Sequence, residues 1–140
     1  MNPESRTALI TGSGKNIGRG IALSLAKEGF NIVVNGVSNP DAIEKTVSEI
    51  SALGVKSIGI LADIGENDGL SKLKGAVLDT FGGVDVLVNN AAIRPSTGFL
   101  EMTDDQWERV MNVNLGAVRM LSKAFIPGMV DRGYGRIINF

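Results

Sequence analysis

Short, almost continuous apolar runs alternate along the chain with longer segments in which apolar residues recur every three or four positions. Five runs have the length and the β-branched content of strands: TALIT (7–11), NIVVN (31–35), SIGIL (57–61), VDVLV (84–88) and GRIINF (135–140). The first is nearly continuous apolar, as expected for a strand that is buried on both faces. The pattern therefore predicts five strands separated by helices.

The intervening segments predict four helical regions. The first places Ile17, Ile21 and Leu25 at helical spacing, which favours one apolar face turned toward the sheet. Asn39 precedes a proline and is typical of an N-cap for the second region, and Thr103 is the corresponding cap for the last. The last helical region is long, and it is either one continuous helix or two helices separated by a break.

Strands that alternate with helices in this way predict right-handed crossovers and a parallel sheet covered on both faces. We therefore expect one α/β domain over residues 1–140, a doubly wound, Rossmann-like sheet of about five strands. In such sheets a ligand binds outside the carboxyl ends of the strands, where the strand order reverses beside the first strand.

Composition narrows the chemistry. Lys and Arg (14) nearly balance Asp and Glu (15), and no charge run or long apolar segment occurs, so neither a nucleic-acid surface nor a membrane span is expected. The N-terminal residues do not resemble a leader peptide, which favours a soluble cytoplasmic protein. The chain has no Cys and no His, so we expect no metal site and no imidazole base. The one tyrosine is Tyr134.

The stretch ALITGSGKNIGRGIA spans the first strand and the start of the first helix. A dinucleotide fingerprint G-x-G-x-x-G begins with Gly12 and Gly14, but its third position is Ile17. A phosphate-binding P-loop also fails, because Asn16 follows Lys15 where Ser or Thr is required. By itself the loop is either a pyrophosphate cradle or a tight turn that needs glycine.

The spacing of Thr11, Gly12, Ile17 and Gly18 resembles the T-G-x-x-x-x-I/L-G signature of the short-chain dehydrogenase/reductase family. Asn16 stands where the family usually has its middle glycine. Asparagine tolerates left-handed backbone better than most residues, so we expect the loop to keep its shape.

Three later stretches strengthen this resemblance. LADI, which contains Asp63, follows the third strand, NNAA follows the fourth, and WERVMNVNLGAV resembles the next family signature. Taken singly, Asp63 could be a simple turn or cap residue, the two asparagines of NNAA a hydrogen-bonded turn, and Asn114 a helix break. Their order supports the resemblance, and the resemblance implies a catalytic role for Asn114 and a contact of Asp63 with the adenine ring. The residues expected to contact the cofactor are Gly12, Gly14, Lys15, Asn16, Ile17, Gly18, Ser38, Asp63, Ile64, Asn90, Ala91 and Ala92.

The end of the second strand bears on the choice of cofactor. It continues NGVSN and has no Asp or Glu to hold a ribose 2′-hydroxyl. Lys15 and Ser38 could instead bind a 2′-phosphate, so NADP(H) is favoured and NAD(H) stays open as the alternative.

The resemblance implies hydride transfer between nicotinamide and a small carbonyl or alcohol substrate, in a full-length enzyme that forms a homo-oligomer, a dimer or a tetramer. Members of the family use a Tyr–Lys pair four residues apart as the acid/base, but Ile138 lies four residues after Tyr134. The family's Ser and Y-x-x-x-K are thus expected beyond residue 140. Within the family the chain resembles 3-oxoacyl-[acyl-carrier-protein] reductase-like members. A non-catalytic nucleotide-binding module and a fold remnant are the alternatives.

Overall fold

A computed structural model describes residues 6–140, and the expectation about a leader peptide falls partly on residues 1–5, outside the described residues. Its five strands are β1 (Thr7–Ile10), β2 (Asn31–Gly36), β3 (Ser57–Leu61), β4 (Val86–Asn89) and β5 (Arg136–Asn139). Its helices are α1 (Asn16–Lys27), α2 (Pro40–Ser51), α3 (Asn67–Phe81), α4 (Asp104–Met111), the π-helical turn η2 (Asn112–Gly116) and α5 (Ala117–Asp131). The predicted alternation of strands and helices is confirmed.

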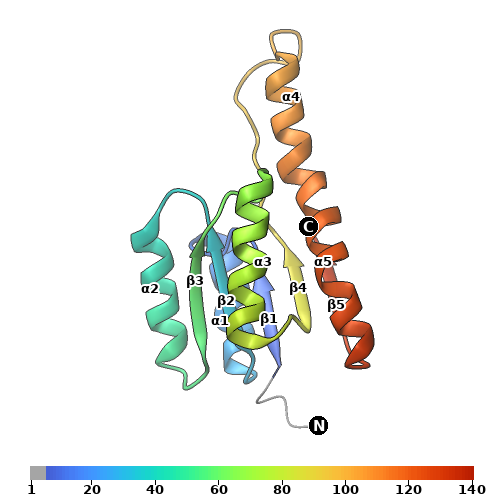
Figure 1. Cartoon of the computed structure of the whole chain (residues 1–140). Coiled ribbons are helices and arrows are strands. Elements are labelled where there is room, and N and C mark those ends of the chain that lie inside the picture. The colour runs from blue at the N-terminus through green and yellow to red at the C-terminus, as the bar shows by residue number, and fades with distance from the viewer. Residues whose placement is uncertain (1–5) are drawn as a thin grey trace.

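All five strands are parallel and lie in the order β3-β2-β1-β4-β5. The chain thus moves outward from β1 to β3, returns past β1 to β4, and ends on β5 at the opposite edge (Figure 1). This reversal beside β1 defines the predicted doubly wound, Rossmann-like fold, and it opens a crevice at the carboxyl ends of β1 and β4.

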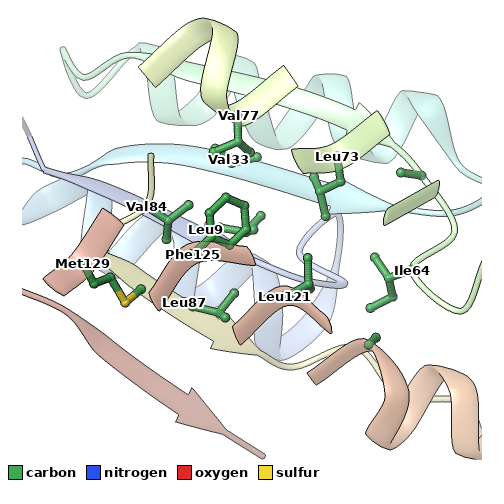
Figure 2. Close-up of a cluster of buried hydrophobic side chains, with 12 residues drawn as sticks. Leu9, Val33, Ile64, Leu73, Val77, Val84, Leu87, Leu121, Phe125 and Met129 are labelled. Carbon is green, nitrogen blue, oxygen red and sulfur yellow. The ribbon is translucent and has the colours of Figure 1, made fainter. Parts of the chain in front are cut away.

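Helices cover both faces of the sheet. One buried cluster joins α3 and α5 to the sheet through Leu73, Val77, Leu121 and Phe125, as Figure 2 shows. A second cluster joins α1 and α2 to the other face, with Ile43 and other side chains that are nearly inaccessible to solvent. Burial on both faces explains why the central strands read as unbroken apolar runs.

The inner face of α1 differs from the prediction. Ile17 is 68% exposed, and the residues of α1 that are buried are Gly18, Ala22 and Ala26. Small residues allow the helix to approach the sheet closely, so the large apolar side chains that set the apparent period lie at the margin of the interface or outside it.

The last helical region is continuous. Thr103 caps α4 as predicted, with a capping box formed with Gln106, and α4 then runs through η2 into α5. The region therefore has no break but contains a π-helical turn, in which the hydrogen bonds span five residues in place of four. β4 begins at Val86, two residues later than predicted.

Over the described residues, no helix is both long enough and apolar enough to cross a membrane. Within residues 6–140 no three acidic, His or Cys side chains gather in an arrangement that could hold a metal ion.

Candidate functional site

A cavity of about 390 Å³ lies at the carboxyl ends of the strands, beside the glycine-rich loop that follows β1. Its wall includes all twelve residues predicted to contact a cofactor: Gly12, Gly14, Lys15, Asn16, Ile17, Gly18, Ser38, Asp63, Ile64, Asn90, Ala91 and Ala92. These residues come from four separate connections of the chain, so the fold gathers them at one place.

The glycine loop leaves no room for side chains at two positions. A Cβ atom on Gly18 would lie 2.4 Å from the carbonyl oxygen of Gly12 and 2.6 Å from Nδ2 of Asn90. Gly12 has φ = 63°, and a Cβ there would meet the backbone of Ala91 at 3.0 Å. Close approach of the loop to the connection after β4 therefore depends on these two glycines.

Asn16 adopts the left-handed conformation expected of it, with φ = 52°, and is the one non-glycine residue with positive φ between residues 6 and 140. Asparagine reaches this region at lower cost than most side chains. The loop thus keeps its left-handed turn although the usual glycine is absent.

Thr11 ties the loop to the connection after β4. Its hydroxyl accepts hydrogen bonds from the N–H groups of Asn90 and Ala91, both at 3.0 Å. In return, Nδ2 of Asn90 donates to the carbonyl oxygens of Thr11 (3.0 Å) and Gly12 (3.2 Å). These paired contacts fix two walls of the cavity relative to each other.

The amino end of α1 faces the cavity without a side-chain cap. Lys15 occupies the N-cap position, accepts no capping hydrogen bond, and is followed by no acidic residue in the first turn. In contrast, α2 and α4 are capped by Asn39 and Thr103 and carry acids in their first turns. First-turn N–H groups have no acceptor within a helix, so the start of α1 offers both donors and positive potential to an anion.

Asn35 was not predicted as part of the site, yet it organises this wall. Its Nδ2 donates to the carbonyl oxygens of Ile60 (3.3 Å) and Ala62 (3.1 Å), and its backbone exchanges hydrogen bonds with Ser13. Asn35 is 1% exposed and joins β2 to both β3 and the glycine loop. The signal was a polar residue inside an apolar strand, which is buried only when it is hydrogen-bonded.

The cavity wall carries more positive than negative charge. Among the residues that line it, Asp63 is the single acid, whereas Lys15 and Arg109 are basic. Ser38 lies after β2 with a lining stretch that contains no carboxylate.

Asp63 is held from two sides. Oδ1 accepts a hydrogen bond from the N–H of Gly65 (2.9 Å), and Oδ2 accepts one from Nη2 of Arg109 (2.5 Å). Partial burial by itself raises the pKa of Asp63, but the hydrogen bonds from Arg109 and Gly65 and the guanidinium charge outweigh it and hold the pKa below its usual range. Asp63 is therefore an ionised acceptor at neutral pH.

Asn114 lies in η2, outside the lining of the cavity, and acts on it through Ile93. Its Oδ1 accepts the N–H of Ile93 (2.9 Å) and its Nδ2 donates to the carbonyl oxygen of Ile93 (3.0 Å). Ile93 itself lines the cavity. The amide side chain thus fixes the backbone of the connection after β4.

Tyr134 lies away from this site. It precedes β5, at the amino ends of the parallel strands, and its ring lies 3.6 Å from the guanidinium of Arg6 and 4.8 Å from that of Arg136. Tyr134 is therefore separate from the cavity.

Nine further residues line the cavity for which no cofactor contact was predicted: Asn35, Gly36, Val37, Asn39, Ala42, Ile43, Ile93, Arg109 and Val113. Most of them neighbour predicted residues along the chain. Arg109 is different, because its partner Asp63 lies 46 positions away and no local pattern marks the pair.

Comparison with known proteins agrees with this geometry. A 3-oxoacyl-[acyl-carrier-protein] reductase of Staphylococcus epidermidis is 39% identical over 135 residues, which is 96% of this chain and 55% of the relative. A D-beta-hydroxybutyrate dehydrogenase of Rhizobium meliloti is 40% identical over 142 aligned positions, with 96% and 53% covered. The chain thus spans about half the length of these curated relatives.

Among solved structures, a metagenomic short-chain oxidoreductase in complex with NADP superposes with a TM-score of 0.91 at 29% identity, covering 99% of this chain and 62% of the other. The sequence model of the short chain dehydrogenase family matches residues 6–140. With its sheet order, its glycine loop and this match, the chain belongs to the short-chain dehydrogenase/reductase family.

Proposed function

We propose that this chain binds NADP(H) in the cavity at the carboxyl ends of its strands, as the nucleotide-binding part of an oxidoreductase that transfers hydride between nicotinamide and a carbonyl or alcohol. The observation that carries the proposal is that all twelve predicted residues line one cavity, beside an uncapped helix end. The structural relative solved with NADP supports the same choice.

The residues present fit such a cofactor. The uncapped first turn of α1 can bind the pyrophosphate, because its N–H groups face the cavity and the glycine loop keeps side chains away from them. Asp63 would accept a hydrogen bond at the adenine end, and Ile93 would border the nicotinamide end, where Asn114 holds it.

Preference for the 2′-phosphate is proposed from Lys15 and Ser38. Both line the cavity, and the lining residues that follow β2 include no carboxylate that would repel a phosphate. A lysine ammonium binds phosphate as a point charge, so removing it lowers the affinity for NADP(H) much more than for NAD(H).

When bound, the nicotinamide supplies or accepts the hydride. The chain's own part is to bind and orient the cofactor and, through Asn114, to order the backbone beside it. No Tyr–Lys pair with the family's spacing occurs in this sequence, since Ile138 lies four residues after Tyr134. We therefore propose that the 140-residue chain binds the cofactor but does not turn over substrate.

A titration followed by nucleotide fluorescence tests the proposal. NADPH should give a saturable change, NADH should bind more weakly, and Lys15→Ala should reduce the preference for NADPH about tenfold, or about 1.4 kcal/mol. Lys27→Ala is the matched control, because Lys27 lies at the far end of the same helix.

The outcomes separate the alternatives. No saturable change with either nucleotide would favour a fold remnant. Equal binding of NADH and NADPH would overturn the cofactor preference. Reduction of a carbonyl compound by this chain alone would contradict the proposal that the chain binds the cofactor without turning over substrate.

A further inference from the structure

Arg109 is the feature of the cavity that the proposed function does not use. It lies on α4, lines the cavity, and its guanidinium bridges two acids: Nη2 lies 2.5 Å from Oδ2 of Asp63 and Nη1 lies 3.4 Å from Oε1 of Glu66. Both acids lie between β3 and α3, so the bridge joins α4 to the connection after β3.

Packing does not explain this arginine. No residue of α4 is buried, and the Arg109 side chain is 35% exposed. Half-exposed ion pairs contribute little to fold stability. Arg19 and Glu49 form a comparable pair that does not line the cavity, with side-chain exposures of 37% and 31% against 35% and 29% for Arg109 and Asp63.

The backbone makes room for Arg109. A Cβ atom on Gly65 would lie 2.2 Å from Nη1 of Arg109 and 2.6 Å from Cγ2 of Val113. Gly65 also donates its N–H to Oδ1 of Asp63. One short connection therefore both admits the guanidinium and holds the other oxygen of the same carboxylate.

The carboxylate keeps capacity for a third partner. An ionised carboxylate has about four acceptor positions, of which Gly65 and Arg109 occupy two. It can only accept hydrogen bonds, and the single hydrogen-bond donor on the adenine base of a dinucleotide is the exocyclic amine. A carboxylate fixed in one orientation discriminates better than one that can rotate.

We infer that Arg109 is a positioning residue for adenine recognition: by fixing the Asp63 carboxylate against the Gly65 amide, it aims the remaining acceptor positions at the exocyclic amine. The inference rests on the proposed function, because it needs a dinucleotide in the cavity. Arg109 acts through Asp63, and its loss is expected to reduce base selectivity rather than to abolish binding.

The test compares two probes that differ at the amine. NADPH and its hypoxanthine analogue, which carries a carbonyl oxygen in place of the amine, are titrated against the chain and its variants. The wild type should bind NADPH about tenfold more tightly, the difference of one hydrogen bond to a charged group. Arg109→Gln and Asp63→Asn should each bring the two affinities within about threefold.

Further variants separate positioning from folding. Arg109→Lys keeps one charged donor and should recover part of the selectivity. The double variant Asp63→Asn/Arg109→Gln should lose no more selectivity than either single variant, because the two residues act as one unit. Arg19→Gln, at the matched pair outside the cavity, should keep the wild-type selectivity.

Each outcome decides. No binding of NADPH by the wild type overturns the proposed function and the inference with it. Wild-type binding without selectivity for the amine, or full selectivity in Arg109→Gln, overturns the inference alone. Equal weakening of both probes in Arg109→Gln, together with a melting temperature well below that of Arg19→Gln, would show a merely structural role.

Discussion

The side of the cavity at the glycine loop and the side at α4 are built in different ways. The glycine-loop wall, from Gly12 to Gly18, is held by close packing, with no space for a Cβ at Gly18, and by hydrogen bonds between Thr11 and Asn90. The α4 wall is held by half-exposed charged side chains, Asp63 and Arg109. Steric exclusion fixes the shape of the first wall, whereas the second can change its chemistry without disturbing the fold.

The largest effect is expected where the first wall is tightest. Gly18→Ala places a methyl group against the Gly12 carbonyl and the Asn90 amide, neither of which can move freely, and should lower the free energy of unfolding by about 3 kcal/mol. Denaturation followed by circular dichroism measures this change, and binding of NADPH should weaken with it.

Gly20→Ala is the control within the same helix. A Cβ on Gly20 meets nothing within 4 Å, so the substitution should instead stabilise α1 by up to about 1 kcal/mol through helix propensity. Equal effects at the two positions would mean that crowding at Gly18 does not shape this wall.

The next largest effect is expected at Thr11, which links the glycine loop to the connection after β4. Thr11→Val keeps the shape of the side chain but leaves the N–H groups of Asn90 and Ala91 without their acceptor, and should cost about 2 kcal/mol in the free energy of unfolding. Thr11→Ser keeps the hydroxyl and should cost only about 1 kcal/mol, for the lost methyl group. If both variants lost the same stability, the hydroxyl would not be the link.

Asn16 gives a smaller effect. Asn16→Ala forces a residue with a Cβ and no local hydrogen-bonding group into φ = 52° and should cost about 1 kcal/mol. Asn16→Gly should change the free energy of unfolding by less than about 0.5 kcal/mol, since glycine adopts this backbone freely and offsets the gain with chain entropy. A stabilisation by alanine would contradict the left-handed geometry.

The smallest effect on stability is expected from the ion pair of Asp63 and Arg109, and it appears only at acidic pH. The folded-state pKa of Asp63 lies below its usual 3.8, so the stabilisation by its ion pair is complete above that value and is lost as the pH falls through the lowered pKa. Because the pair is partly exposed, the loss should be less than about 1 kcal/mol.

Unfolding free energies measured from about pH 5 to pH 2 for the wild type, Asp63→Asn and Arg109→Gln test this prediction. Both variants should show a shallower fall in stability with acid than the wild type. Parallel curves for all three proteins would mean that Asp63 titrates as an ordinary surface carboxylate.

The sequence predicted the fold well because each buried strand is a nearly pure apolar run and several helix ends carry local caps. Asn39 and Thr103 cap α2 and α4 as predicted, since capping depends on a few neighbouring residues. Ile17 was misjudged because apolar periodicity gives weight to large side chains, whereas the close contact of α1 with the sheet uses glycine and alanine.

The residues of the site likewise fall into two groups, those that local motifs predicted and those that they did not. Motifs after β1, β3 and β4 predicted the residues that come together in the cavity, because the carboxyl ends of parallel strands converge. Asn35 carried a signal, a polar residue inside an apolar strand, but its partners Ile60 and Ala62 could not be assigned from it. Arg109 carried none, since its role depends on Asp63 in a distant segment. Long-range pairing leaves no mark in local spacing.

The exposed position of α4 has a practical consequence for spectroscopy. The chain contains one tryptophan, Trp107, which lies on α4 two positions before Arg109 and is 52% exposed. Intrinsic indole emission therefore reports on this single helix, with no background from the core. The α4 side of the cavity thus has a fluorescent tryptophan next to it in the same helix, whereas the glycine loop has none.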